Sequence, residues 1–147
     1  MNMLVVILPL LLLLVIATVC DLRHREVPDW ISAGVLLWGI VLTGLGLHSV
    51  GWLGLLWGVL VGFVLSATVF YLGGLGGADV KLIAAMGAVL GPVALLFVLF
   101  WMALAGGVLA LVAAAQGQRD FAYVPAITAG FVAYMVYPGE VWRHLFP

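Results

Sequence analysis

The chain has 147 residues, of which 67% are hydrophobic and only 7% are charged, and its mean hydropathy is +1.34. A soluble domain carries roughly a quarter of its residues as charged side chains, so the composition predicts an integral membrane protein. The net charge of -1 and the lack of a basic run argue against a nucleic-acid partner. The single cysteine, Cys20, excludes an internal disulfide framework and a zinc site built on paired cysteines.

The apolar runs predict an all-α polytopic bundle of about six transmembrane helices, since one crossing needs about 20 mostly apolar residues. All of residues 1–147 are expected to form this single domain, with no separate soluble domain. Gly91-Pro92 is either a tight turn or a kink, and the turn is favoured because roughly 35 apolar residues exceed one crossing. The expected spans are Met3–Cys20, Trp30–Leu47, Trp52–Leu72, Val80–Leu90, Val93–Ala115 and Tyr123–Tyr137.

Basic residues in short loops predict the orientation of these spans. Arg23 and Arg25 follow the first span, Lys81 lies at the start of the fourth, and Arg119 follows the fifth. Cytoplasmic loops carry the excess of Lys and Arg. The connections that follow the first, third and fifth spans are therefore expected in the cytoplasm, which places the N-terminus outside. Six spans place the C-terminus outside as well. Arg143 would then be the one basic residue that departs from the excess of Lys and Arg on the cytoplasmic side.

Small residues recur every four positions along the third span, at Gly54, Gly58, Gly62 and Ser66. Such a ridge lets a neighbouring helix backbone approach closely. Packing within the chain is the favoured interpretation, because a polytopic bundle supplies its own neighbours; pairing with a second copy is the alternative.

Two acidic residues stand out by their position. Asp21 directly follows the first apolar run, and Asp79 opens the fourth span after a glycine cluster. Two carboxyl groups brought together at a low-dielectric boundary share a proton, which suits them to activate a water and polarise a carbonyl. Structural roles stay open: Asp79 is a plausible helix N-cap, and Asp21 is able to end a helix and reach headgroup water.

Three segments carry a resemblance to a known family. Segment 21–29 (DLRHREVPD), segment 76–82 (GGADVKL) and segment 123–127 (YVPAI) resemble, in order and spacing, the motifs of the type IV prepilin peptidases. The resemblance implies a hydrolase, an aspartic endopeptidase in which Asp21 and Asp79 are catalytic. The residues that it adds as motif support, or as places for close backbone approach, are Gly76, Gly77, Ala78, Lys81 and Pro28.

The sequence departs from the family motifs at two places. Ala78 stands where a second glycine is usual, and Asp29 where Asn is usual. Alanine disfavours a positive φ, so any tight turn there would depend on Gly76 or Gly77. Asp29 is expected to cap the second span as well as Asn would.

The larger members of the family carry a cysteine-rich zinc region and a methyltransferase activity, and this sequence has no cysteine pair. It resembles the short, peptidase-only branch associated with tight-adherence (Flp-type) pili. No metal and no cofactor are expected.

The resemblance also implies the partners and the location. The substrate would be a prepilin or pilin-like membrane protein, which loses its basic leader at the cytoplasmic face of the bacterial inner membrane. Lys81 is expected to meet lipid phosphates, with neutralisation of local charge as the alternative. Glu26 and Asp29 are expected to lie in a solvated loop, with attraction of the basic leader as the alternative.

A small polytopic transporter or a structural membrane subunit is the alternative function. A transport carboxylate would lie near the middle of the bilayer, whereas no predicted span has a charged residue at its centre. A purely structural subunit would leave the ordered motifs unexplained.

Overall fold

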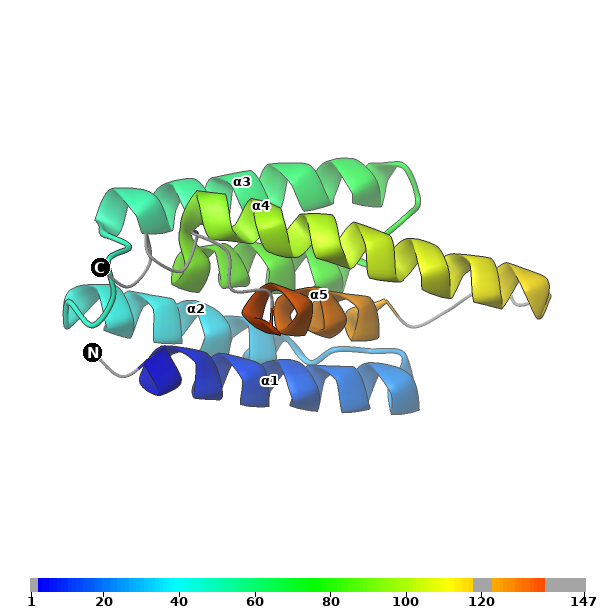
Figure 1. Ribbon diagram of the computed structural model, residues 1–147, viewed down its shortest axis with the longest axis horizontal. Coiled ribbons are helices and arrows are strands. Elements are labelled where there is room, and N and C mark those ends of the chain that lie inside the picture. The colour runs from blue at the N-terminus through cyan, green and yellow to red at the C-terminus, as the bar shows by residue number, and fades with distance from the viewer. Residues whose placement is uncertain (1–2, 118–122, 137–147) are drawn as a thin grey trace.

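The computed structural model describes residues 3–117 and 123–136, and these parts of the chain form a bundle of helices without strands (Figure 1). About 85% of the described residues are helical, as the sequence predicted. The predictions made for Arg119, Tyr137 and Arg143 concern residues outside the described parts of the chain. The helices are α1 (Met3–His24), α2 (Asp29–Gly44), α3 (Trp52–Tyr71), α4 (Gly77–Ala115) and α5 (Val124–Val136).

Three of the helical stretches are long and apolar enough to cross a membrane, namely Val5–His24, Trp52–Tyr71 and Gly77–Ala115. Helices α2 and α5 are apolar but shorter, with 16 and 13 residues. Large hydrophobic side chains are exposed along the outer faces of the bundle, such as Leu53 and Leu111. These features confirm an integral membrane protein. The number of about six spans stays a prediction.

The 39 residues of α4 form two helical segments that meet at Gly91. Gly91 has φ 73° and ψ 173°, a backbone conformation that is essentially restricted to glycine. A straight helix would separate Ile83 from Leu95 by about 18 Å. Both residues nevertheless pack against Gly62 of α3. The chain therefore turns back at Gly91 (Figure 1), and the prediction of a turn is confirmed.

The small residues of α3 bring its backbone against both segments of α4. Gly58 contacts the backbone of Gly87 so closely that neither position has space for a side chain. One turn further along, Gly62 packs on the backbone of α4, and the buried Ser66 donates its hydroxyl to the Gly62 carbonyl at 2.6 Å. The predicted ridge is thus used inside the chain, because close approach needs residues without bulky side chains.

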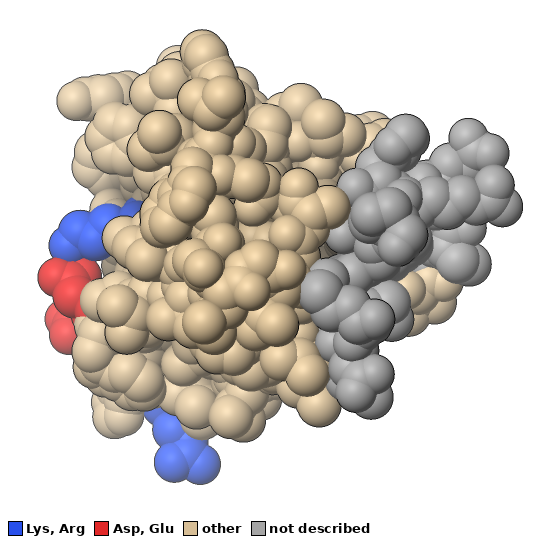
Figure 2. All heavy atoms as spheres, turned by 90° about the vertical axis from the view of Figure 1, so that its left-hand side faces the viewer, with Lys and Arg blue, Asp and Glu red and all other residues tan. Residues whose placement is uncertain are grey.

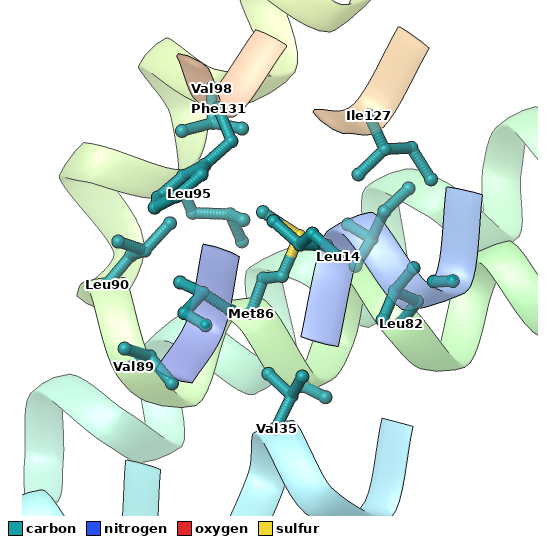
Figure 3. Packing of buried hydrophobic residues seen from close by; sticks show 14 of the residues in the cluster. Leu14, Val35, Leu82, Met86, Val89, Leu90, Leu95, Val98, Ile127 and Phe131 are labelled. Atoms are coloured by element: carbon teal, nitrogen blue, oxygen red, sulfur yellow. The ribbon is translucent and has the colours of Figure 1, made fainter. Parts of the chain in front are cut away.

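The first segment of α4 lies in the middle of the bundle, and nearly all its side chains from Leu82 to Leu90 are buried. Figure 3 shows Met86 of this segment between residues of other helices, with Leu14 from α1 and Ile127 from α5 nearby. The core therefore joins α1, α4 and α5. This packing sets the end of α1 beside the start of α4.

The charged residues gather toward one end of the bundle. The end of α1, the turn 72–76 and the start of α5 lie at this end, whereas the turn 45–51 lies at the other (Figure 1). Figure 2 looks onto the end with the turn 45–51, and there the described residues show charged side chains only at the margin of the view. The two ends therefore differ in charge, which is the pattern that membrane orientation depends on.

Candidate active site

Asp21 lies in the last turn of α1, where its side chain is only 8% exposed. Its Oδ2 atom accepts a hydrogen bond of 3.0 Å from the backbone N–H of Val124, at the start of α5. Its own carbonyl accepts the N–H of Arg25, which has a φ of 54° and ends the helix. The first span is therefore longer than predicted, and the Asp21 carboxyl group faces α5 instead of headgroup water.

Asp79 is the third residue of α4 and is 7% exposed. Gly76 is the N-cap of this helix, and its backbone N–H donates a hydrogen bond of 3.0 Å to Oδ2 of Asp79. Asp79 is therefore not the N-cap residue itself. Its carboxylate instead caps the helix from the third position, where it accepts a hydrogen bond from the backbone N–H of the N-cap. A side chain at Gly76 would come within 3.1 Å of Oδ2 of Asp79, so glycine leaves the space that this bond needs.

The fold brings the carboxyl groups of Asp21 and Asp79 together from positions 58 residues apart in the sequence. The two groups lie close enough for their charges to act on each other. Each accepts one backbone N–H, from Val124 and Gly76 respectively. One carboxyl group of the pair comes from each of the first two motifs, and both lie at the same end of the bundle. Their catalytic role stays a prediction.

Tyr123 completes the neighbourhood of the pair. Burial, and after it the nearby charge of Asp79, raises the pKa of Tyr123 above its ordinary value. Its hydroxyl group packs against Gly106 of α4, where an added Cβ would lie only 2.7 Å away. Segment 123–127 carries part of the resemblance, but neither Tyr123 nor Val124 was predicted as a site residue. The one available signal was the proline segment at a helix start.

The remaining motif residues have structural roles. Pro28 is the N-cap of α2, and Gly77 and Ala78 are the first residues of α4. The expectation that Gly76 or Gly77 supplies a positive φ is wrong, because Gly76 has φ -81° and Gly73 carries the positive value of 79°. Ala78 is therefore compatible with its place in the helix.

Lys81 forms an ion pair with Asp29, with Nζ 2.8 and 2.9 Å from the two carboxylate oxygens. The ion pair agrees with the alternative interpretation of Lys81, neutralisation of local charge, whereas its contact with lipid phosphates stays a prediction. The prediction that Asp29 caps α2 is wrong, because Pro28 is the N-cap and Asp29 makes no capping bond. Because the side chains of Lys81 and Asp29 are largely exposed, the ion pair contributes at most about 1 kcal/mol. Glu26 is exposed in the same connection, as predicted.

Potential metal ligands do not gather within residues 3–117 and 123–136: no group of three His, Cys, Asp or Glu side chains is placed to hold an ion. His48 is buried at the opposite end, and burial lowers its pKa.

Comparison with known proteins agrees with the motifs. Residues 8–111 match the model of the type IV leader peptidase family, a range that contains both Asp21 and Asp79. Searches of curated proteins and of solved structures gave no match. The family match covers well over half of the chain and includes the turn at Gly91 as well as both segments of α4 up to Leu111. The chain therefore belongs to the type IV leader peptidase family.

Proposed function

We propose that this protein is an aspartic endopeptidase that removes the basic leader from prepilin-like membrane proteins, with Asp21 and Asp79 as its catalytic residues. Membership of the type IV leader peptidase family supports a peptidase activity. The observation that carries the proposal is the pair itself: two buried carboxyl groups, from separate motifs, whose charges interact at one end of an apolar bundle.

The chemistry needs one ionised and one protonated carboxyl group. The ionised group takes a proton from a water molecule, which attacks the carbonyl carbon of the scissile peptide bond, while the protonated group donates to the carbonyl oxygen. The tetrahedral intermediate then collapses as the leaving nitrogen receives a proton. Because coupled carboxyl groups titrate as a pair, the acid and base roles belong to Asp21 and Asp79 jointly.

The backbone hydrogen bonds support this role by holding the carboxyl groups in place. One donor belongs to the start of α5 and the other to the N-cap of α4. Both donors lie in helix starts, where free N–H groups are available. Each carboxyl group is therefore oriented by rigid backbone, which is the condition for a precise catalytic geometry.

We further propose that the chain crosses the bacterial inner membrane six times, with its N-terminus outside and its carboxyl pair at the cytoplasmic face. Arg23, Arg25 and Lys81 lie at the same end of the bundle as the pair, which supports that orientation. The substrate would then present its basic leader in the cytoplasm and its apolar segment in the bilayer. We place the enzyme in the short branch associated with tight-adherence (Flp-type) pili.

Co-expression with a tight-adherence prepilin that carries a C-terminal tag tests the function. We expect a faster-migrating product on a gel, and mass spectrometry of its new N-terminus should locate the cut at the end of the basic leader. The matched controls are the Asp79→Ala enzyme and a prepilin with its cleavage-site glycine replaced. Accumulation of uncut precursor beside well-expressed wild-type enzyme would reject the proposal for that substrate class.

A further inference from the structure

A groove of about 650 Å³ lies beside the carboxyl pair, between α3, the turn 73–75 and both segments of α4. Leu65 and Val69 of α3 form one wall. Ala103, Gly107 and Ala110 of α4 contribute to the facing wall. A Cβ added at Gly107 would meet no atom within 4 Å, so this wall borders open space.

The groove has the chemistry of an apolar binding site. Among the described residues that line it, none carries a charged side chain. The hydroxyl groups of Ser66 and Thr68 donate to backbone carbonyls of their own helix, at 2.6 and 2.7 Å. A ligand here therefore meets mainly methyl and methylene groups, together with the exposed backbone of small residues, which favours the close approach of another apolar helix.

One end of the groove lies next to the candidate active site. Tyr123 lines the groove, and the charge of Asp79 acts on its hydroxyl group. The lining residues Gly73, Gly74 and Leu75 directly precede Gly76, whose backbone N–H donates to Asp79. A chain that lies along the groove therefore ends near Asp79.

We propose that the groove binds the apolar helical segment that follows the cleaved bond in the substrate, so that the bond itself is presented to Asp21 and Asp79. This inference rests on the proposed function. A substrate segment fits better than a lipid, because the groove ends next to the carboxyl pair and none of its described lining side chains is cationic, as a phosphate headgroup would favour.

Site-specific photo-crosslinking tests where the substrate lies. A benzophenone amino acid is placed at Ala103 or Ala110 in full-length Asp79→Ala enzyme, in membranes with the co-expressed tagged prepilin. The matched positions are Leu104 and Leu111, which are exposed on the same helix and do not line the groove. We expect an enzyme–prepilin adduct from the first two positions at several times the yield of the others. Equal yields, or adducts with lipid only, would overturn the proposal.

Activity gives the second readout. Ala103→Trp and Ala110→Trp fill the groove and should raise the KM for prepilin by about 10-fold, with a smaller effect on kcat. Leu104→Trp and Leu111→Trp add the same bulk outside the groove and should leave both constants near wild type. If the wild-type enzyme cleaves prepilin and all four variants behave alike, the groove proposal fails while the proposed function stands. If the wild-type enzyme cleaves no prepilin, the proposed function fails first.

Discussion

The backbone N–H of Val124 donates a 3.0 Å hydrogen bond to Oδ2 of Asp21, although the two residues are 103 positions apart in the sequence. This bond ties the end of α1 to the start of α5. Val124, the first residue of α5, is therefore a neighbour of the carboxyl pair. The charge of Asp79 also acts on Tyr123, the residue just before it.

Val124→Pro should lower cleavage activity, because proline lacks the N–H that holds Asp21. Proline is tolerated at the first position of a helix, so the protein should still accumulate in the membrane. A hydrogen bond to a charged group contributes about 1.5–3 kcal/mol, which corresponds to about a 10- to 100-fold loss. Cleavage rates of purified enzyme measure the effect. Val124→Ala keeps the N–H and is the control; an equal loss in both variants would contradict the positioning role.

Replacement of either acid of the proposed catalytic pair should abolish cleavage. Asp21→Asn and Asp79→Asn keep the size of the side chain but remove a proton-carrying group, so each should fail almost as completely as the alanine variant. Combining the two changes should cost little more than one change, because the residues act as a unit. Kinetic assays of the single and double variants check this. The control is Asp29→Asn, which removes only an exposed ion pair and should stay active. If the loss of rate in the double variant equals the product of the two single losses, the two acids act independently and the prediction is contradicted.

The pH profile of cleavage should be bell-shaped. At low pH both carboxyl groups are protonated and no base remains, whereas at high pH both are ionised and no acid remains. Activity therefore peaks between the two apparent pKa values of the pair. Initial rates across a pH series measure the profile. A chelator should not change it; inhibition by a chelator that added zinc reverses would support a metallopeptidase instead.

Gly106→Ala should impair the site through Tyr123. The new methyl group would lie 2.7 Å from the Tyr123 hydroxyl oxygen and 3.0 Å from Cζ, so the ring must shift. Misplacement beside a reacting group costs up to about 100-fold in rate. Adding Tyr123→Phe removes the nearest atom and should restore part of the activity. Gly34→Ala in α2 gains the same helix propensity with no contact closer than 3.6 Å, lies outside the groove, and is the control. Equal activities of Gly106→Ala and Gly34→Ala would refute this role of Tyr123.

The orientation of the bundle can be measured with single cysteines in a Cys20→Ala background whose cleavage activity is intact. Gly51 is exposed at the end with the turn 45–51, where an added side chain meets no atom within 4 Å, and Gln116 is exposed at the other end. A membrane-impermeant maleimide should label Gly51→Cys on intact spheroplasts, and Gln116→Cys only after lysis. The reverse pattern would place the carboxyl pair outside and exclude cleavage at the cytoplasmic face.

The sequence by itself determined the membrane environment, the helical class and the two acids. Long apolar runs allow only structures that satisfy their backbone internally. The ridge through Gly58 and Gly62 could be predicted because its small residues repeat at helical spacing. The turn at Gly91 could be predicted because the apolar run is too long for one crossing. These features depend on residues close together in the chain.

Only the tertiary structure decided what surrounds the acids. The bonds from Val124 to Asp21 and from Lys81 to Asp29 join segments 103 and 52 positions apart. No local pattern encodes such pairs, because they follow from how α1, α2, α4 and α5 pack around a shared core. The same packing placed Tyr123 against Gly106 and opened the groove beside Asp79. Side-chain periodicity specifies which face of a helix is buried, but the neighbour that covers that face is chosen by the fit of the whole bundle.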